Sequence, residues 1–422
     1  MGRGTDGRRV GLSTRMTRAL TALTLGFTLI AAACSSSDAS NRTPVSSSTS
    51  STAPETTATT VPSAASEVAL NSSWRVVAVG RGAKPVLALD RTGRPAVAYM
   101  LESRDGFVAF SAQADGWAGQ TVAEGYFYGP IGLAFDPDDT PHIVYHDHQD
   151  LQFDENLGDL THAVRAGGSW TLGAAEDDGH DGWDSTVAIA PDGTVHAAGV
   201  DPAQFGSTVG VEHYVLGPGG WTVEPIGSGP VEYEWNVSLA VKADGTPAMT
   251  FFDSNSQDLR YAELVDGIWT IETVATAGDV GRFSSLAFDA AGTPHISFYE
   301  MDTPTTGTVH YATKAGAEWQ VEMVGDLGAT FIDFAGARRI TSLAVGPDGA
   351  PRVAFSDEVS VFFAGRSDAG WTVEEIATAG DLPLGQLVSL AIDDEGTPHL
   401  ALFEVTDKSP VDGTVVYLTP ES

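Results

Sequence analysis

The chain has 422 residues, and 22 lysines and arginines stand against 56 aspartates and glutamates, for a formal net charge of −34 at pH 7. A field of this sign repels phosphate backbones, so the composition argues against nucleic-acid binding. The chain has one cysteine, which excludes an intramolecular disulfide.

Residues 1–33 have the composition of an export signal. An arginine-rich start leads into an uncharged, largely apolar run over residues 19–33, which is short for a membrane span. The run ends in Ala31-Ala32-Ala33-Cys34, which resembles the lipobox of bacterial lipoproteins. That resemblance implies cleavage before Cys34, diacylation of this residue, and a lipid anchor on the extracytoplasmic side of the cell membrane. The alternative is an ordinary free cysteine near a cleavage site.

Residues 34–68 are dominated by serine, threonine, alanine and proline, with few charges and no apolar periodicity. Such a segment buries too little surface to offset its ordering entropy. We expect a disordered tether between the anchor and the folded domain.

Residues 69–422 are predicted to form one repetitive domain. Residues 283–322 contain four short apolar runs that alternate at period 2 and are separated by turn residues, as in consecutive antiparallel strands. The tryptophan that opens the fourth strand recurs seven times at intervals of 43 to 53 residues. These residues are Trp74, Trp117, Trp170, Trp221, Trp269, Trp319 and Trp371.

The two ends of the domain predict how the repeats are arranged. The first recognisable strand, residues 74–79, is of the fourth-strand type, whereas the last repeat stops after its third strand near Tyr417. We therefore predict an all-β, seven-bladed β-propeller closed by one N-terminal and three C-terminal strands, because ring closure protects sheet edges.

The repeat carries the patterns SLAxDxxGxPHI, xLxYA and GxWxxExV over residues 74–418. It resembles secreted bacterial β-propellers that are loosely grouped with sialidase-like propellers. The resemblance implies the fold. It does not extend to the sialidase Asp-box, because the D-x-x-G turn here joins the first and second strands, so no sialidase catalytic residue is carried over.

Two features recur too regularly to indicate a ligand site. An acid follows the opening of the second strand by six positions in six repeats, and histidines recur at one position of the second strand. We interpret both as structural, the acids as acceptors of local backbone hydrogen bonds. The acids are Asp147, Asp201, Asp253, Glu300, Asp357 and Glu404, and the histidines are His142, His295 and His399.

A third position varies between repeats. Four residues before each first-strand marker lie Ala83, Gly129, Trp183, Trp235, Arg282, Arg339 and Gln386, with Tyr128, Tyr233 and Phe283 next to three of them. Exposed tryptophans and tyrosines stack on sugar rings, and arginines bind carboxylate, sulfate or phosphate groups. The sequence thus predicts a ligand site at Trp183, Trp235, Arg282 and Arg339. The alternative is that the tryptophans wedge between blades and the arginines pair with the acids.

Two loops of the second and third repeats are rich in carboxylates and histidines. They contain His148 and His180, which we include among the ligand-binding candidates, and Asp147, Asp150, Asp178 and Asp181, which are candidate metal ligands. Dense carboxylates suit a divalent cation such as calcium. No specific metal-binding motif is present, and loops of this kind are also found simply solvated.

Three functions remain open. The first is a lipid-anchored binding protein for a glycan or another envelope or extracellular ligand, including anionic ones. The second is an extracellular lyase or glycoside hydrolase acting on acidic polysaccharides. The third is a protein-interaction scaffold. We favour binding, and we expect a monomer. No nucleophile elbow, phosphate loop, CxxC pair or dinucleotide fingerprint is present, so enzymes of those common types lack support.

Overall fold

The computed structural model describes residues 69–71, 73–103, 105–148, 158–175, 182–201, 210–228, 237–303, 306–329, 340–357, 359–378, 384, 387–405 and 413–421. The described part of the chain begins at residue 69. The predicted signal over residues 1–33 and the predicted tether over residues 34–68, which includes Cys34, lie outside it and stay predictions. Within the described ranges, no helix is long and apolar enough to cross a membrane.

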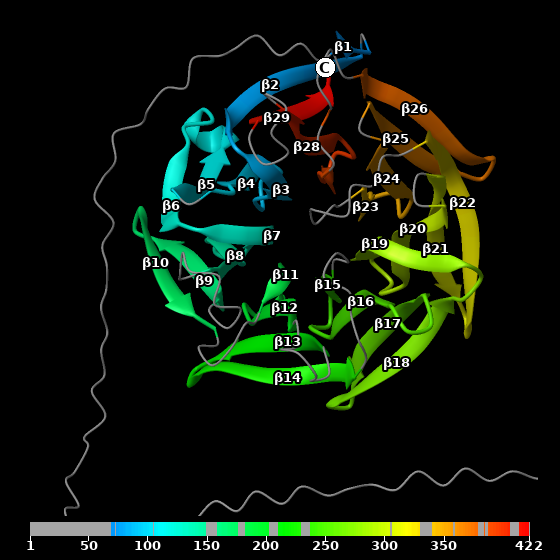
Figure 1. Ribbon diagram of the computed structural model, residues 1–422, viewed down its shortest axis with the longest axis horizontal. Coiled ribbons are helices and arrows are strands. Elements are labelled where there is room, and N and C mark those ends of the chain that lie inside the picture. The colour runs from blue at the N-terminus through cyan, green and yellow to red at the C-terminus, as the bar shows by residue number, and fades with distance from the viewer. Residues whose placement is uncertain are drawn as a thin grey trace, which may run out of the picture. The chain divides into compact units, whose positions relative to one another are not determined.

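The described strands form seven antiparallel sheets, which are the blades of a ring (Figure 1). Blade 1 comprises β3 (Ala83–Leu89), β4 (Pro95–Leu101), β5 (Gly106–Ala112) and β6 (Gln120–Gly125), with the 3-10 helix η1 (Gln113–Asp115) between the last two. Blade 2 comprises β7 (Phe127–Phe135), β8 (Pro141–Asp147), β9 (Asp159–Ala166) and β10 (Ser169–Ala174). Blade 3 comprises β11 (Trp183–Ile189), β12 (Val195–Asp201), β13 (Gly210–Gly217) and β14 (Gly220–Ser228).

The remaining four blades repeat this order. Blade 4 comprises β15 (Ser238–Val241), β16 (Pro247–Asp253), β17 (Asp258–Val265) and β18 (Ile268–Ala275). Blade 5 comprises β19 (Asp279–Phe288), β20 (Pro294–Thr303), β21 (Thr306–Ala315) and β22 (Glu318–Ala329). Blade 6 comprises β23 (Thr341–Val345), β24 (Pro351–Ser356), β25 (Ser360–Ser367) and β26 (Gly370–Thr378). Blade 7 comprises β27 (Ser389–Ile392), β28 (Pro398–Val405), β29 (Gly413–Pro420) and the N-terminal β2 (Trp74–Arg81).

Blade 7 confirms the predicted closure of the ring. Strand β2 pairs antiparallel with β29, from Trp74 opposite Pro420 to Arg81 opposite Thr414. The structure adds one strand that the repeat pattern does not predict. This is β1 (Ala69–Leu70), which lies beside β26 and gives blade 6 a fifth strand. The chain therefore adds one strand to blade 6 and one to blade 7 before the first complete blade begins.

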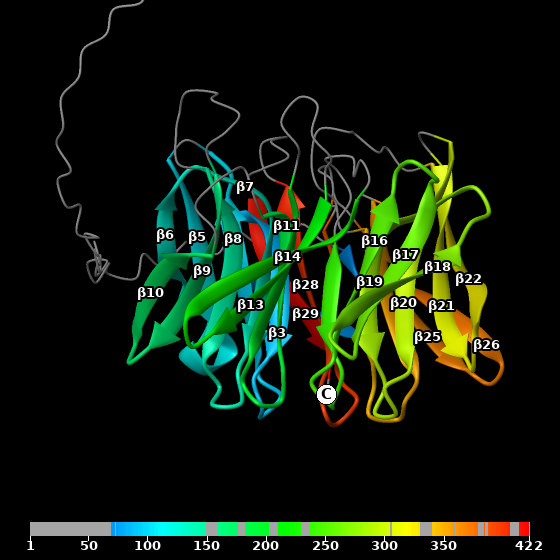
Figure 2. The same cartoon turned by 90° about the horizontal axis from the view of Figure 1, so that it is seen from below.

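The topology separates two faces of the ring. The turns between first and second strands, and between third and fourth strands, gather on one face, below the sheets in Figure 2. We call this the hairpin face. The second strands end, and the first strands begin, at the opposite face, which we call the top face. The top face is the one to which the variable repeat position belongs.

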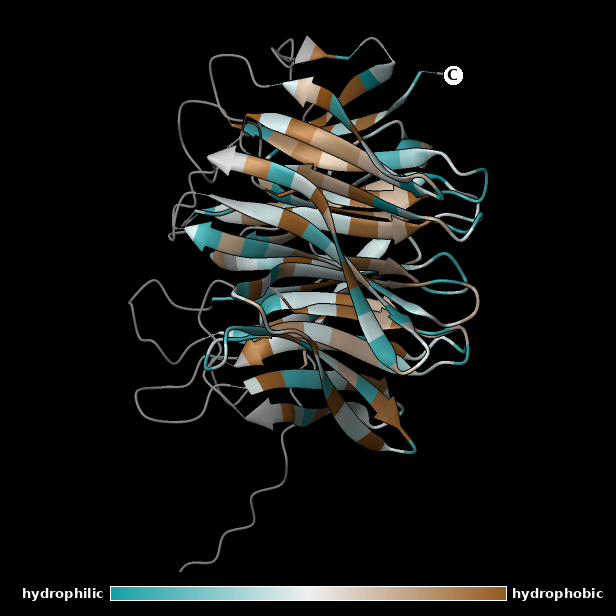
Figure 3. Ribbon diagram, turned by 90° about the vertical axis from the view of Figure 1, so that its right-hand side faces the viewer, coloured by the Kyte–Doolittle hydropathy of each residue, from teal (hydrophilic) through white to brown (hydrophobic). Residues whose placement is uncertain are grey.

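In each blade the second strand is more buried than the fourth strand at the outer edge. All seven residues of β4 are buried, as are the first six of β8, because both faces of these strands contact neighbouring sheets. In β10, at the outer edge of blade 2, Trp170 is the one buried residue. The mixture of apolar and polar residues along the strands is visible in Figure 3. Each core cluster lies between adjacent sheets.

The recurrent tryptophans are clamps between blades. Each one packs against an aromatic or imidazole ring on the third strand of the preceding blade, with ring centroids 5.0 to 5.6 Å apart. The pairs are Trp170 with Phe110, Trp221 with His162, Trp269 with His213, Trp319 with Tyr261, Trp371 with Tyr311, Trp74 with Phe363 and Trp117 with Tyr417. The last two pairs extend the same contact across the closure.

The serine of the S-L-A motif makes a second contact between blades. Its hydroxyl oxygen accepts a hydrogen bond from the backbone N–H of the equivalent leucine in the next blade, at 3.0 Å in four cases. The serines are Ser238, Ser285, Ser342 and Ser389, and the last of them bonds Leu87 of blade 1. These bonds satisfy first-strand N–H groups that have no partner strand on that side.

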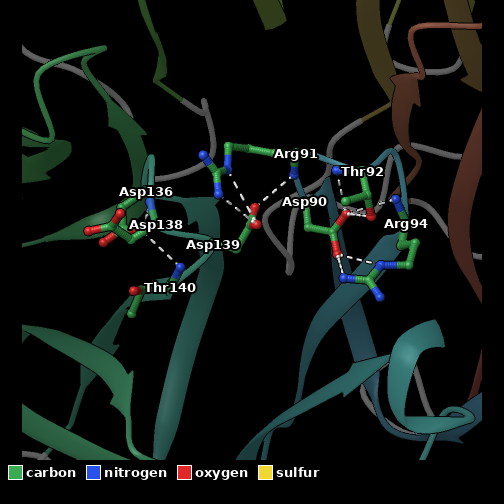
Figure 4. Close-up of polar contacts among 8 residues, drawn as sticks. All are labelled: Asp90, Arg91, Thr92, Arg94, Asp136, Asp138, Asp139 and Thr140. Carbon is green, nitrogen blue, oxygen red and sulfur yellow. Dashed lines mark hydrogen bonds and ion pairs between the residues drawn. The ribbon is translucent and has the colours of Figure 1, made fainter.

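The D-x-x-G turns on the hairpin face are organised by their aspartates (Figure 4). Oδ1 of Asp90 accepts hydrogen bonds from the backbone N–H groups of Thr92 (2.9 Å) and Arg94 (3.0 Å). Burial alone would raise the pKa of Asp90, but the hydrogen bonds from Thr92 and Arg94 outweigh it and lower that pKa. Arg91 joins this turn to the next one, because its backbone N–H donates to Asp139 of blade 2 at 2.8 Å.

Candidate functional site

The predicted site residues fall into two groups. Trp183, Arg282, Asp147 and His148 lie in the described part of the chain, together with the backbone of Tyr128. The others lie outside it, so their contribution to a site stays a prediction. They are Trp235, Arg339, Tyr233, His180, Asp150, Asp178 and Asp181.

In blades 3 and 5 the variable repeat position lies at a bulge near the start of the first strand. Trp183 pairs with Val200 and Arg282 with Tyr299, and the register shifts immediately after each of them. The next residue in both blades, Asp184 or Phe283, has a positive φ, of 54° and 53° respectively. This conformation is uncommon for residues other than glycine, and it fits the extra residue of a bulge.

Blade 2 requires a correction of the sequence count. Four positions before its marker lies Gly129, but Tyr128 is the residue that pairs with the second strand, opposite His146. Gly129 takes the positive-φ position that follows, with a φ of 81°. The bulge of blade 2 has one residue more than those of blades 3 and 5, so Tyr128 occupies the variable position.

A group of rings lies at the top face between blades 2 and 3. His146 near the end of β8 is fully buried, and its ring centroid lies 5.3 Å from that of Trp183 at the start of β11. The ring of His148 lies 6.1 Å from His146 and 5.1 Å from Tyr126. The backbone N–H of His148 donates to the carbonyl of Tyr126 at 3.0 Å, which ties the two ring-bearing segments together. We call Tyr126, His146, His148 and Trp183 the ring cluster.

His146 departs from the repeat. The equivalent position, five residues after the opening of the second strand, is buried in every blade and carries an imidazole only here. The others carry Met100, Val200, Phe252, Tyr299, Ser356 and Phe403. A Cβ atom on Gly158 would lie 2.3 Å from Cε1 of His146, so the backbone approaches the imidazole where only glycine fits. An alignment of the seven repeats, column by column, would reveal His146 from the sequence.

Two carboxylates lie at the top-face end of blade 2, where Asp147 follows His146 on β8 and points to the opposite face of the strand. Asp147 and Asp159 are opposite each other on β8 and β9. Burial, and then the charge of Asp159, raise the pKa of Asp147 to about 6. The acids of blades 4 and 5 have basic neighbours instead, since Asp253 binds Arg260 at 2.9 Å and Glu300 binds His310 at 2.9 Å.

The described residues do not complete a metal site. Within the described ranges, no group of three or more His, Cys, Asp or Glu side chains could hold a metal ion. Asp147 is the one predicted metal ligand among them, and Asp150, Asp178 and Asp181 lie outside. A divalent cation such as calcium therefore stays a prediction.

Arg282 is held between blades 4 and 5. Its side chain is 5% exposed, and its Nε and Nη2 atoms donate to the carboxylate of Asp279 at 2.6 and 2.7 Å. The guanidinium carbon lies 4.4 Å from the ring centroid of Phe252 in blade 4. This geometry resembles the alternative to a ligand site that the sequence also allows, in which the arginine pairs with an acid. The ligand-binding role of Arg282 stays a prediction.

Trp183 also has contacts inside the protein. Its half-buried side chain packs against the core cluster that contains Val200, Val237 and Leu239, between blades 3 and 4. One part of the indole therefore anchors it, while its ring approaches His146 from the neighbouring blade. An anchored aromatic residue presents its remaining surface with little conformational entropy to lose.

Comparisons with known proteins bear on the fold. No protein-family model matches the sequence, and no curated protein matches it. Among solved structures, an ulvan lyase of a new polysaccharide lyase family, bound to -[GlcA(1-4)Rha3S]-, matches with a TM-score of 0.53 at 13% identity, over 82% of this chain and 96% of its own.

Two further solved structures also match. A mutant α-L-arabinofuranosidase from Fusarium graminearum, in complex with an iminosugar inhibitor, matches with a TM-score of 0.50 at 11% identity, over 70% of this chain and 92% of its own. A lectin from Aleuria aurantia in complex with Fucα1-6GlcNAc has a TM-score of 0.46 at 12% identity, over 70% and 95%. Identities this low establish similarity of fold alone. The chain is similar to these proteins as a β-propeller.

Proposed function

We propose that the top face of the propeller binds a glycan of the cell envelope or the extracellular space, with the ring cluster as part of the binding surface. The observation that carries this proposal is His146, an imidazole in a buried column that is otherwise free of imidazoles, placed against Trp183. Aromatic and imidazole rings contact the apolar faces of sugars, while imidazole nitrogens and carboxylates hydrogen-bond their hydroxyl groups. The partly exposed rings of Trp183 and His148 offer both kinds of group at the top face, and both pack on the fully buried His146.

The folds compared above support the same class of ligand. The ulvan lyase is bound to an oligosaccharide, and the arabinofuranosidase to an iminosugar inhibitor. Both proteins use a propeller for carbohydrate chemistry, which makes a glycan the first ligand to test. An anionic glycan would need cationic contacts, for which Arg282 and Arg339, the latter outside the described residues, are the candidates from the variable position.

A catalytic role on acidic polysaccharides is the second proposal. It is favoured by two groups that can exchange protons at the same end of blade 2, the imidazoles of His146 and His148 and the carboxylates of Asp147 and Asp159 on opposite positions of β8 and β9. Groups of this kind exchange protons in lyases and glycoside hydrolases. Docking of a partner protein on the same face is the third possibility, for which the described residues offer no specific support.

The binding proposal is tested with the full-length protein on an array of neutral and acidic glycans, with and without a chelator. We expect retention of a glycan and no turnover. Trp183→Ala should weaken binding about tenfold, because loss of one stacked aromatic costs on the order of 1 kcal/mol. Met323→Ala, at a side chain 60% exposed on outer strand β22, is the matched control and should bind like the native protein.

The outcomes of this experiment separate the proposals. If unsaturated or reducing ends are released from a polysaccharide, the protein is an enzyme, and the catalytic proposal replaces the binding proposal. Unchanged affinity of the Trp183→Ala variant would remove the ring cluster from the binding surface. Loss of binding with the chelator would support a divalent cation in the acidic loops.

We propose further that Cys34 carries a lipid that holds the protein on the extracytoplasmic side of the cell membrane. In a bacterial host with lipoprotein processing, the native chain should incorporate a labelled fatty acid and sediment with membranes. Cys34→Ser should lose the label and move to the soluble fraction, because acyl burial at about 0.8 kcal/mol per methylene would be gone. Label retained in the Cys34→Ser variant would contradict the proposal.

A further inference from the structure

In blades 2, 3, 5 and 7 a histidine of the second strand lies beside a ring on the third strand, near the hairpin face. In blades 5 and 7 the pair is a histidine with a tyrosine. Nδ1 of His295 lies 2.5 Å from the hydroxyl of Tyr311, and Nδ1 of His399 lies 2.6 Å from the hydroxyl of Tyr417. All four side chains are buried.

In blades 2 and 3 the tyrosine is replaced by a second histidine. Nδ1 of His142 lies 2.9 Å from Nε2 of His162, and Nδ1 of His196 lies 3.0 Å from Nε2 of His213. The rings are stacked, with centroids 5.1 and 5.2 Å apart, and all four side chains are buried. The pairing of the second and third strands shows that His162 and His213 occupy, in their own blades, the position that Tyr311 and Tyr417 occupy in blades 5 and 7.

This exchange changes what happens on protonation. A phenol oxygen can accept a hydrogen bond from an imidazolium, so a histidine beside a tyrosine can be charged or neutral without losing its partner. Two histidines share their hydrogen bond only while one facing nitrogen has no proton. When both rings are charged, two N–H groups and two positive charges face each other at hydrogen-bond distance in a buried site.

A carboxylate faces one histidine of the pair in blade 2 and each histidine of the pair in blade 3. His142 faces Asp136 of the β7–β8 turn at 3.5 Å, whereas His162 faces His142 and the indole of Trp221 from β14. His213 faces Glu224 of β14 at 3.1 Å and the indole of Trp269 from β18. His196 faces His213 and, on the β11–β12 turn, Asp192. Each pair can hold one proton, whereas a second proton would bring two N–H groups face to face across the 2.9 or 3.0 Å between the ring nitrogens.

The expected protonation agrees with this geometry. Burial, and then the charge of the partner histidine, lower the pKa values of His162 and His196 to about 4. Burial also lowers those of His142 and His213, against the opposing effect of Asp136 and Glu224. The folded-state pKa values lie below the ordinary value of 6.5, so the unfolded chain binds more protons. Stability is then complete above about pH 6.5 and falls as the pH decreases towards 4.

We propose that the two His–His pairs form an acid-sensitive seam that joins blades 2, 3 and 4 and is absent from blades 5 and 7. His162 and His213 also carry the tryptophan clamps Trp221 and Trp269, so disruption of a pair loosens contacts between blades. Strand β8 holds His142 near its start and His146 near its end. Acidification would thus loosen the part of the ring that holds the ring cluster. This inference does not depend on what the top face binds.

The test compares the thermal unfolding of the full-length protein between pH 7 and pH 5 with that of His162→Tyr/His213→Tyr. This variant gives blades 2 and 3 the pairs already present in blades 5 and 7. A pKa near 4 in the folded state makes each pair contribute a factor of about thirty to the unfolding constant at pH 5. We therefore expect the native Tm to fall by about 5 °C more than that of the variant.

A second variant tests the same idea in the opposite direction. Tyr311→His/Tyr417→His should add acid sensitivity, with a Tm that falls more steeply below pH 6.5 than that of the native chain. Amide hydrogen exchange at pH 5, corrected for the intrinsic rate, should be faster in β8, β9, β12 and β13 of the native chain than in His162→Tyr/His213→Tyr. Equal pH profiles for the native chain and His162→Tyr/His213→Tyr would overturn the proposal, as would equal exchange in those four strands.

Discussion

A chain that begins at residue 83 should fail to form a stable propeller. It lacks β2, so the edge of β29 loses its partner strand over the eight residues from Trp74 to Arg81. It also lacks Trp74, which is 5% exposed and packs on Phe363 of blade 6. Loss of one such tryptophan costs about 3–5 kcal/mol, which is a large share of the stability of a typical domain. We expect aggregation or non-cooperative unfolding, measured by size-exclusion chromatography and thermal denaturation.

Two longer chains are the controls for this truncation. A chain from residue 69 keeps every described strand and should unfold like the native protein. A chain from residue 74 lacks β1 and the hydrogen bond from Asn71 to Glu374, which is 2.8 Å long and exposed, so it should lose only about 1 kcal/mol. Cooperative unfolding of the chain from residue 83 would show that six complete blades and three strands suffice.

The sequence predicted the number of blades and the closure because both depend on local patterns. Alternation, turns and a recurrent tryptophan can be counted along the chain, and the ends can be compared with the repeat. The physical role of the markers could not be read in this way. Trp371 contacts Tyr311, and the hydroxyl of Ser342 bonds Leu390, across blade boundaries that the sequence does not display.

The variable position shows a different limit. Counting backwards from a marker assumes that every first strand has the same number of residues, and the bulge of blade 2 breaks this assumption. Tyr128, rather than Gly129, is opposite His146. A bulge adds one residue without changing the direction of the strand, so an ungapped count misplaces every residue beyond it.

The candidate site was only partly predictable. Trp183 and His148 were identified from the sequence, and the structure adds Tyr126 and His146 to them as one cluster. The proximity of Asp147 to Asp159 depends on the register between β8 and β9, which no spacing along the chain specifies.

Arg282 has two possible roles that make opposite predictions. In the first role, Arg282 stabilises the contact between blades 4 and 5, and Arg282→Ala should lower the free energy of unfolding by about 3–5 kcal/mol. The reason is that the carboxylate of Asp279 loses its guanidinium partner in a site where the side chains of Arg282 and Asp279 are 5% and 12% exposed. Replacing both members, as in Asp279→Asn/Arg282→Met, should cost less, since no buried charge remains. Urea denaturation of the three proteins measures these differences.

The control for charge removal is Arg366→Ala. Arg366 binds Glu322 at 2.7 Å, but the two side chains are 38% and 34% exposed, so solvent screens the pair and its loss should cost at most about 1 kcal/mol. If Arg282→Ala instead unfolds like the native chain and loses affinity for acidic glycans, Arg282 is a ligand contact. A guanidinium in a buried ion pair contributes to the free energy of unfolding, whereas one that contacts a ligand contributes to the free energy of binding. Measuring both quantities on Arg282→Ala therefore distinguishes the two roles.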